Sequence, residues 1–485
     1  MNNPANPTEF KLLKAILFPH KGKEIPFTPL VLSFNYGEDV TAPFVSAELE
    51  ILDSASLLNG NGTNPPIKGG ERVQIDVQCI NETDAFKYEF VIWQISNRFV
   101  RQNKQYYTMS LISGEALQNE LTRVPRNMSG NPEAIMGTLL TKDLGTKKPI
   151  YSEKSLFDVQ LLGNMRRPFD IIGDIAVKCV SSKGDYGQNK TKSSSGTAPK
   201  TTAKPIKGSG GFFFWETFRG YNFFAVDSLC ADSKSKLYSD KLKETRSKWG
   251  VETWGPYIEQ QGNVEGSGDT RYNILEAQFA SEINMMESLR KGKYSSLITF
   301  YNVSTGQYEE YVYSLKNAYD NMAHLGGQES LDLIPVQNKE LSEYPTRIMS
   351  MLIDHELWYN EPGVASPEPS DKADKPTKFA DWSKYYMAQS LARYEILKNQ
   401  VCSIVIPGNP RICAGDRIDI RLMSKLPKAE ASKEIFDRES SGVYLIKSVS
   451  HHYDAIKGTN GKFATTLYLV RDSFGIKGDA SSHGN

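Results

Sequence analysis

The two ends of the chain carry related sequence blocks, and this internal repeat constrains the fold more than any other feature. Residues 64–77 (NPPIKGGERVQIDV) align with residues 409–422 (NPRICAGDRIDIRL), with Asn, Pro, Ile, Gly, Arg and Ile at matching positions. Each block is typical of a turn fixed by proline, a conformationally free glycine and a strand that is polar on one face. Such self-similarity indicates two copies of one structural unit.

The match continues downstream in the same order. Residues 90–99 resemble residues 444–453, and residues 107–113 parallel residues 465–471. The C-terminal copy is longer by nine residues, which we assign to the charged loop around residues 434–440, because loops tolerate insertions. Three blocks in one order favour duplication over chance similarity of strand patterns.

The duplication makes definite structural predictions. Superposing Gly70–Leu111 on Gly415–Leu469 should align strands in one order, with Arg72 matching Arg417 and Ile75 matching Ile420 on the buried faces. Two related barrels in one chain also have a consequence for symmetry. Three such chains close a ring of six similar barrels, which fits a sixfold partner and leaves no open strand edge between barrels.

The middle of the chain has a different pattern. Apolar residues at helical spacing predict helices over residues 273–291 and 379–399. Residues 181–211, rich in Ser, Thr, Gly and Lys, and residues 361–378, rich in Pro and charge, are typical of linkers.

We therefore predict an α+β, β-rich fold in which two related β-barrels are separated by α/β insert domains. The expected units are a first barrel over 8–120, a mixed α/β insert over 121–268, the first part of a second barrel over 269–315, a helical or irregular insert over 316–395, the rest of the second barrel over 396–475, and a loose tail over 476–485.

Composition excludes several classes of protein. Fifty-seven basic residues balance 57 acidic ones, whereas a dedicated nucleic-acid binder has a basic excess. No apolar run reaches the length of a membrane helix, and the first residues lack the pattern of a signal peptide. The five cysteines are scattered without a CxxC motif, which predicts free thiols rather than disulfides or a zinc site (Cys79, Cys179, Cys230, Cys402, Cys413).

Sequence signatures of catalysis are missing as well. There is no HExxH, GxSxG, GxGxxG or phosphate-binding loop. His451 and His452 are adjacent, but consecutive strand residues face opposite sides and cannot share a metal ion. We expect no enzyme activity, no cofactor and no metal site.

Two local features have alternative interpretations. The aromatic run Phe212, Phe213, Phe214 and Trp215 fits a buried strand that opens a domain, and less often an anchor for a partner protein. The lysines of residues 190–207 form a basic run without acids, which fits a solvated linker better than contact with an acidic partner or passing DNA.

Several short segments resemble the central baseplate hub of T-even-like contractile-tailed phages, a family related to the type VI secretion spike. They are residues 36–40 (YGEDV) with 43–47 (PFVSA), 69–73 (GGERV), 168–170 (PFD), 212–217 (FFFWET) through 220–223 (GYNF), and the pattern Ile406-Pro407-Gly408, Ala414-Gly415-Asp416, Ser441-Gly442-Val443-Tyr444, His451. They span nearly the whole chain, and the last pattern is the most specific. The 181–211 linker is an addition to the familiar hub.

The resemblance implies a homotrimer in a phage virion, assembled in the host cytoplasm. Its two tail-tube-like barrels per chain would form a pseudo-sixfold ring that adapts a hexameric tail tube to a trimeric cell-puncturing spike and leaves a channel for DNA. The implied partners are a spike protein or tail lysozyme, a tail tube or tube-initiator protein, baseplate wedge proteins and a tape measure protein, with DNA only as passing cargo and no stable membrane insertion. Two alternatives remain, a tail-associated cell-wall hydrolase and a receptor- or carbohydrate-binding β-protein.

Overall fold

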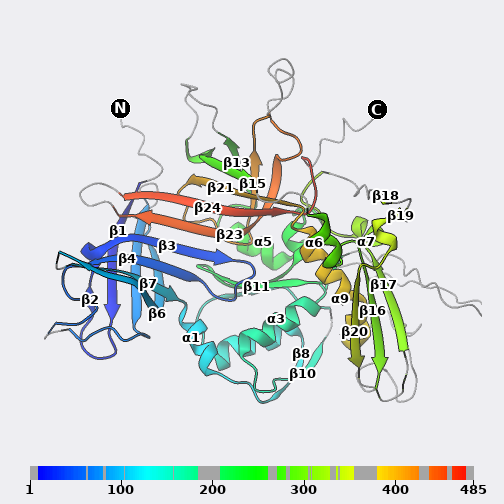
Figure 1. Ribbon diagram of the computed structural model, residues 1–485, viewed down its shortest axis with the longest axis horizontal. Helices are drawn as coiled ribbons and strands as arrows, with labels where there is room; N and C mark the ends of the chain where they lie inside the picture. The colour runs from blue at the N-terminus through cyan, green and yellow to red at the C-terminus, as the bar shows by residue number, and fades with distance from the viewer. Residues whose placement is uncertain are drawn as a thin grey trace, which may run out of the picture.

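Two groups of β-strands share one large sheet (Figure 1). The structure is a computed structural model, and it describes the chain except residues 1–8, 62–63, 80–82, 103, 157, 184–207, 260–269, 280–283, 304–305, 307, 328–334, 337–338, 354–378, 425–435, 456–460 and 477–485. The linker predicted over 361–378, most of that over 181–211 and nearly all of the tail lie outside the described residues. Among the described residues, no helix is long and apolar enough to cross a bilayer.

The first group of strands, which we call the N-terminal repeat, pairs in the order β3-β4-β7-β6-β5-β1, and every pair is antiparallel. Apolar residues alternate along these strands, so one face packs into a shared core that contains Phe34, Leu49 and Ile75. The strands are β1 (Glu9–Phe18), the short β2 (Ile25–Pro26), β3 (Val31–Asp39), β4 (Ser46–Asp53), β5 (Arg72–Cys79), β6 (Phe86–Arg101) and β7 (Lys104–Ile112).

The second group, the C-terminal repeat, pairs in the order β14-β13-β22-β23-β24-β21-β15 and has its own core around Ile404, Ile420 and Leu467. Its strands are β13 (Trp254–Glu259), β14 (Asn273–Ile274), β15 (Glu276–Phe279), β21 (Gln400–Pro407), β22 (Arg417–Arg421), β23 (Gly442–Asp454) and β24 (Gly461–Arg471). The far end of β23 pairs with β3, and the first residues of β24 pair with β1. The two longest strands of this repeat therefore belong to both groups.

The predicted strand order is confirmed in both repeats. β5, β6 and β7 form an antiparallel meander, as do β22, β23 and β24. The register also agrees with the sequence alignment, because Arg72 lies opposite Val91 and Arg417 lies opposite Leu445. Each middle strand carries a β-bulge at the matching place, after Ile92 in β6 and after Ile446 in β23.

The first strand of each meander, β5 or β22, is preceded by the same turn. Gly70 and Gly415 both have positive φ, +83° and +88°, which explains glycine at these positions. Their amides donate to the carbonyls of Ile92 and Ile446, at 2.8 Å in each case. Ile75 and Ile420 are both fully buried, as predicted. Arg72 is exposed over Phe18, whereas the matching Arg417 is buried because an insert covers it.

The inserts between the repeats contain most of the helices. The first packs the buried hairpin β11–β12 against α3. Its elements are α1 (Gly114–Leu121), β8 (Asn127–Gly130), α2 (Pro132–Thr138), β9 (Ile150–Ser152), β10 (Val159–Leu162), α3 (Pro168–Lys178), β11 (Phe212–Thr217), β12 (Gly220–Ala225), α4 (Val226–Cys230) and α5 (Asp240–Lys248).

The second insert is a three-stranded sheet, in the order β17-β16-β20, with α9 packed against one face. Its elements are α6 (Met285–Arg290), β16 (Ser295–Asn302), β17 (Tyr308–Ser314), α7 (Leu315–Ala318), β18 (Pro335–Val336), β19 (Lys339–Glu340), β20 (Arg347–Ile353) and α9 (Phe379–Ile396). The predicted helix over 379–399 is thus confirmed to within three residues.

The predicted helix over residues 273–291 is wrong. Residues 273–274 and 276–279 instead form β14 and β15, and among the described residues of this segment only α6 is helical. Long-range pairing of β14 with β13 and of β15 with β21 overrides the helical spacing of the apolar residues in this segment. Leu275, which the pattern placed on a buried helix face, is about half exposed.

Candidate assembly site

The two repeats meet where the end of β3 lies along β23, a contact that we call the joint. β3 pairs with β23 over seven residues, from Asp39 opposite Ser448 to Ser33 opposite Asp454. Beyond the last pair, the Val40 amide donates to the Lys447 carbonyl at 2.9 Å, and Lys447 Nζ lies 3.0 Å from Asp39 Oδ2. The joint is therefore a continuous backbone ladder, closed at one end by an ion pair.

Glu38 connects three segments at the joint. Its carboxylate accepts hydrogen bonds from Tyr36 Oη at 2.7 Å, the Phe218 amide at 2.8 Å and the Ala414 amide at 2.9 Å. Ser448 Oγ donates to its carbonyl oxygen at 2.8 Å. Burial raises the pKa of Glu38 to about 7, although these donors favour the charged form. The residue ties β3 to the first insert and to the loop before β22.

An ion pair from the first insert fixes the same loop. Arg219, in the turn between β11 and β12, donates to both oxygens of Asp416 at 2.9 Å, and both side chains are buried. Burial alone would raise the pKa of Asp416, but Arg219 holds it below its ordinary value. Trp254 Nε1 also donates to Asp416, at 3.0 Å. A bidentate pair of this kind fixes orientation as well as distance.

A second buried cluster attaches α9 to the end of β24. Arg393 Nη1 donates to Asp472 at 2.7 Å, and its Nε lies 3.3 Å from Asp227. His324 Nδ1 lies 2.9 Å from the same Asp472 carboxylate. Burial would raise the pKa of Asp472, but Arg393 and His324 lower it far below its usual range. Arg393 of the second insert therefore contacts both Asp227 of the first insert and Asp472 of the C-terminal repeat, which connects both inserts to that repeat.

The structure places the aromatic run of residues 212–215 in strand β11. Phe212, Phe214 and Trp215 are buried, and half-buried Phe213 packs on Tyr394 with ring centroids 5.1 Å apart. Trp215 Nε1 donates to the Ala414 carbonyl at 2.9 Å. The buried-strand interpretation therefore describes these residues. Three of the four side chains face the interior of their own chain.

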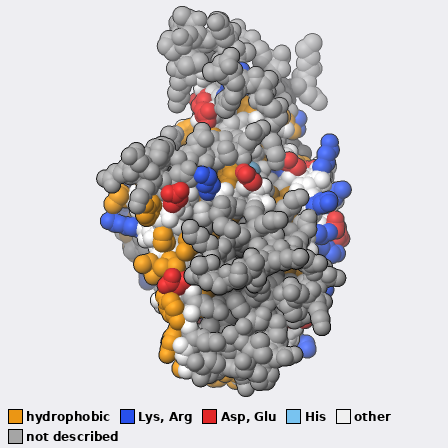
Figure 2. Space-filling model, turned by 90° about the vertical axis from the view of Figure 1, so that its right-hand side faces the viewer, with side chains coloured by type: hydrophobic (Ala, Val, Ile, Leu, Met, Phe, Trp, Pro, Cys, Tyr) orange, Lys and Arg blue, Asp and Glu red, His pale blue; other side chains and the backbone are white. Residues whose placement is uncertain are grey.

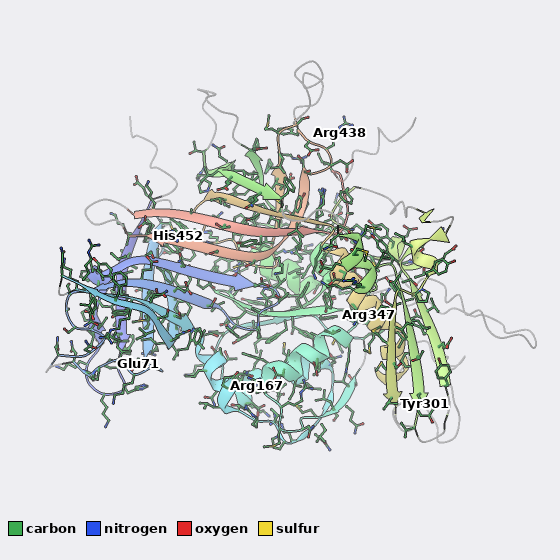
Figure 3. The ribbon with its side chains drawn as sticks, viewed as in Figure 1. Glu71, Arg167, Tyr301, Arg347, Arg438 and His452 are labelled. Atoms are coloured by element: carbon green, nitrogen blue, oxygen red, sulfur yellow. The ribbon has the colours of Figure 1, made fainter. Side chains whose placement is uncertain are left out.

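The two adjacent histidines lie on β23 and face opposite sides, as expected. His451 is fully buried beside Tyr36 and Phe463, and burial lowers its pKa to about 3, so its ring is neutral. His452 is exposed near the joint (Figure 3), where its Nδ1 contacts Asn35 Oδ1. Neither histidine takes part in a metal-binding group among the described residues.

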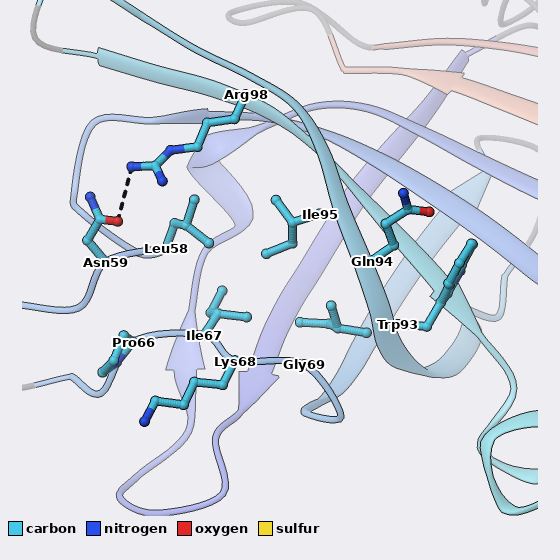
Figure 4. Close-up of a pocket in the computed structure, with 11 residues that line it drawn as sticks. Leu58, Asn59, Pro66, Ile67, Lys68, Gly69, Trp93, Gln94, Ile95 and Arg98 are labelled. Atoms are coloured by element: carbon cyan, nitrogen blue, oxygen red, sulfur yellow. Dashed lines mark hydrogen bonds between the residues drawn. The ribbon is translucent and has the colours of Figure 1, made fainter. Parts of the chain in front are cut away.

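The second half of β6, from Trp93 to Arg101, is another feature of the N-terminal repeat. Large apolar side chains are exposed there, with Trp93, Phe99 and Val100 at 53%, 55% and 65% exposure. A pocket of about 580 Å³ lies beside the strand. Leu58, Ile67 and Ile95 point toward one another across it, and Arg98 Nη2 donates to Asn59 Oδ1 at 3.2 Å (Figure 4).

The outer face of the β17-β16-β20 sheet also exposes apolar side chains. Val312, Ile348 and Leu352 are more than half exposed. Figure 2 shows this end of the molecule, where hydrophobic side chains gather along one edge.

All five cysteines are free and buried. Burial raises the pKa of the Cys179, Cys230 and Cys402 thiols to about 12, which makes them poor nucleophiles.

Sequence reasoning did not predict the contacts that Glu38, Arg219 and Asp416 make at and around the joint. Glu38 and Asp416 stand in segments that the repeat and the resemblance marked, but their carboxylate contacts depend on loops far apart in sequence. Arg219 carried no signal of its own. For Glu38, the available signal was an acidic residue inside an otherwise alternating strand.

Solved structures match the chain over nearly its whole length at low identity. A tail protein from Neisseria meningitidis is 11% identical over 96% of this chain and 97% of that chain, with a TM-score of 0.46. The 43 kDa tail protein of prophage MuSo2 from Shewanella oneidensis is 10% identical over 95% of this chain and 98% of that chain, with a TM-score of 0.45. A type VI secretion component from E. coli is 9% identical over 96% of this chain and 76% of that chain, with a TM-score of 0.37. No family model and no curated protein matches the sequence.

Proposed function

We propose that this chain is the baseplate hub of a contractile phage tail. In this proposal each repeat is a tube-like barrel, and three chains form a ring of six barrels. The ring adapts a hexameric tail tube to a trimeric spike and leaves a channel through which DNA passes. The function is geometric and needs no catalytic residue.

One observation carries the proposal, which is the agreement between the two repeats. Strand order, register, the positive-φ glycine and the position of the bulge all coincide. A chain with two equivalent units presents similar surfaces twice, so three chains approximate sixfold symmetry while keeping true threefold symmetry. The sequence resemblance to baseplate hubs supports the same proposal independently of this geometry.

The proposed partners follow from the two symmetries. The sixfold face would receive a tail tube or tube-initiator protein, and the threefold face would receive a spike protein. Wedge and tape measure proteins would contact the inserts and the channel. We infer that the chain works in the virion after assembly in the host cytoplasm.

The solution mass of the purified chain tests the proposal. Three chains of 54.3 kDa give about 163 kDa, and we expect this mass by analytical ultracentrifugation at micromolar concentration. Negative-stain images should show a ring with six similar lobes. A chain that stays monomeric up to about 100 μM, a concentration at which even weak specific interfaces are occupied, would contradict the proposal. Turnover of purified peptidoglycan would instead favour a hydrolase.

A further inference from the structure

The two repeats differ at one strand edge, which is paired in the C-terminal repeat and has no described partner strand in the N-terminal repeat. In the C-terminal repeat, β22 covers the first part of one edge of β23 and β3 covers the rest. In the N-terminal repeat, β5 covers β6 as far as Val91. Beyond the bulge, no described strand pairs with the same edge of β6. Exposed strand edges with apolar side chains are sites at which another strand adds.

The pocket beside β6 corresponds to a space that is filled in the C-terminal repeat. Gly69, Trp93 and Gln94 line the pocket, and the alignment matches them with Ala414, Lys447 and Ser448. Those three residues are the ones that hold the end of β3 at the joint. Ala414 and Ser448 donate to Glu38, and the Lys447 carbonyl accepts from Val40. The pocket therefore marks the position of a β3-like segment.

Among the described strands, β15 has the place in the C-terminal repeat that β3 has in the N-terminal repeat. β15 pairs with β21 as β3 pairs with β4, and Gln278 takes the position of Asn35. The other edge of β15 pairs with no described strand. The amino-acid sequence after β15 also resembles the end of β3. Residues 280–283 are Ala-Ser-Glu-Ile, and the matching residues 37–40 are Gly-Glu-Asp-Val. Each segment has an acid followed by a β-branched residue.

We infer that the free edge of β6 and its pocket bind β15 of a second copy of this chain, which repeats the joint between chains. This inference rests on the proposed ring. The contact is head-to-tail, because each copy offers β6 to one neighbour and β15 to the other. Three such contacts alternate with three joints inside chains and complete six equivalent connections.

The joint also gives the register between chains. Asp454 lies opposite Ser33 in the joint. Arg101 corresponds to Asp454, because Arg101 lies opposite Lys104 of β7 and Asp454 lies opposite the matching Lys462 of β24. In the same way Glu276 corresponds to Ser33, because Ser33 lies opposite Glu50 of β4 and Glu276 lies opposite the matching Val405 of β21. Arg101 of one copy then lies opposite Glu276 of the next, and both are exposed. Neither forms an ion pair with a described residue of its own chain. A cross-strand pair of opposite charges stabilises such a contact.

Charge exchange tests this register in the full chain. We expect Arg101→Glu and Glu276→Arg each to raise the concentration for half-assembly of the trimer by about tenfold, because like charges oppose each other at three contacts. The double variant R101E/E276R should restore assembly to within about threefold of the unmodified chain. Glu48→Arg, an exposed charge reversal on β4, is the matched control and should leave assembly unchanged.

Disulfide trapping tests proximity by a separate readout. Phe99 should lie opposite Gln278 of the next copy, so chains with Phe99→Cys mixed with chains with Gln278→Cys should form covalent dimers under oxidation. Chains with both substitutions should form covalent trimers. Tyr301→Cys mixed with Gln278→Cys is the control and should form neither, because Tyr301 lies at the far end of β16 (Figure 3).

The outcomes separate the inference from the proposed function. If the charge-exchange variants form the trimer at the same concentration as the unmodified chain and no cross-link forms, the β6–β15 contact is wrong, but the proposed ring still stands. A chain that remains monomeric overturns both. Rescue by the double variant, together with mixed-chain cross-links, establishes the contact.

Discussion

At the scale of single residues, Glu38 connects the joint to the first insert and to the loop before β22. Its carboxylate accepts from a hydroxyl and two amides that come from three separate segments. Truncating it leaves buried donors without an acceptor, and each such donor costs about 1–3 kcal/mol.

We predict that Glu38→Ala lowers the free energy of unfolding by roughly 3 kcal/mol or more, since three donors lose their partner. Urea unfolding followed by tryptophan fluorescence measures the change. Glu48→Ala removes an exposed carboxylate from the neighbouring strand and should change stability by less than about 0.5 kcal/mol. Equal effects of the two variants would show that Glu38 does not organise the joint.

At the scale of elements, the sequence predicted the strands of the two meanders better than the segments and loops that pack around them. The strands of the two meanders follow alternation that is visible in the sequence, and the glycines mark where they begin. The prediction for 273–279 was wrong because the conformation of this segment depends on pairing with β13 and β21, and β21 lies more than 100 residues further along the chain. The contacts of Arg219 with Asp416 could not be predicted for the same reason, because a loop-to-loop ion pair leaves no periodic signal.

Equivalent positions in β5 and β22 should respond equally to mutation. We expect Ile75→Asp and Ile420→Asp each to cost more than about 4 kcal/mol, because each buries an unpaired charge in a strand core. Ile75→Val and Ile420→Val, the conservative controls, should each cost about 1 kcal/mol. Thermal melting and limited proteolysis measure both pairs. If one repeat tolerated the aspartate, the two positions would not be equivalent.

The linker between α3 and β11 should contribute little to stability. Its ends are held together, since Val180 bridges to Gly210 and the Gly211 amide donates to the Cys179 carbonyl at 2.9 Å. Replacing residues 184–207 by a few Gly and Ser should therefore shift Tm by less than about 3 °C, because loop-closure entropy changes by only about 0.6 kcal/mol per doubling of length.

The control extends the replacement through Gly211. This longer change removes the hydrogen bond from Ser209 Oγ to Asp227, at 2.8 Å, and should lower Tm markedly. If the shorter replacement alone lowered Tm by 10 °C, residues 184–207 would pack against the rest of the chain.

At the scale of the whole molecule, the repeats are joined by shared strands rather than by a linker. β23 and β24 pair within the C-terminal repeat at one end and with β3 and β1 at the other. A linker would let two units turn against each other, but a continuous strand does not. The angle between the repeats is therefore set by backbone hydrogen bonds, which is what a ring of fixed size requires.

These shared strands also determine when the protein can finish folding on the ribosome. β3 and β1 are made early and pair with β4 and β5, but the strands on their other edges, β23 and β24, emerge only near the end of the chain. At about 5–20 residues per second, the N-terminal strands wait roughly 20–80 s for them. A chain that ends before β23 lacks the strand that pairs with the other edge of β3, so it cannot form the joint between the two repeats.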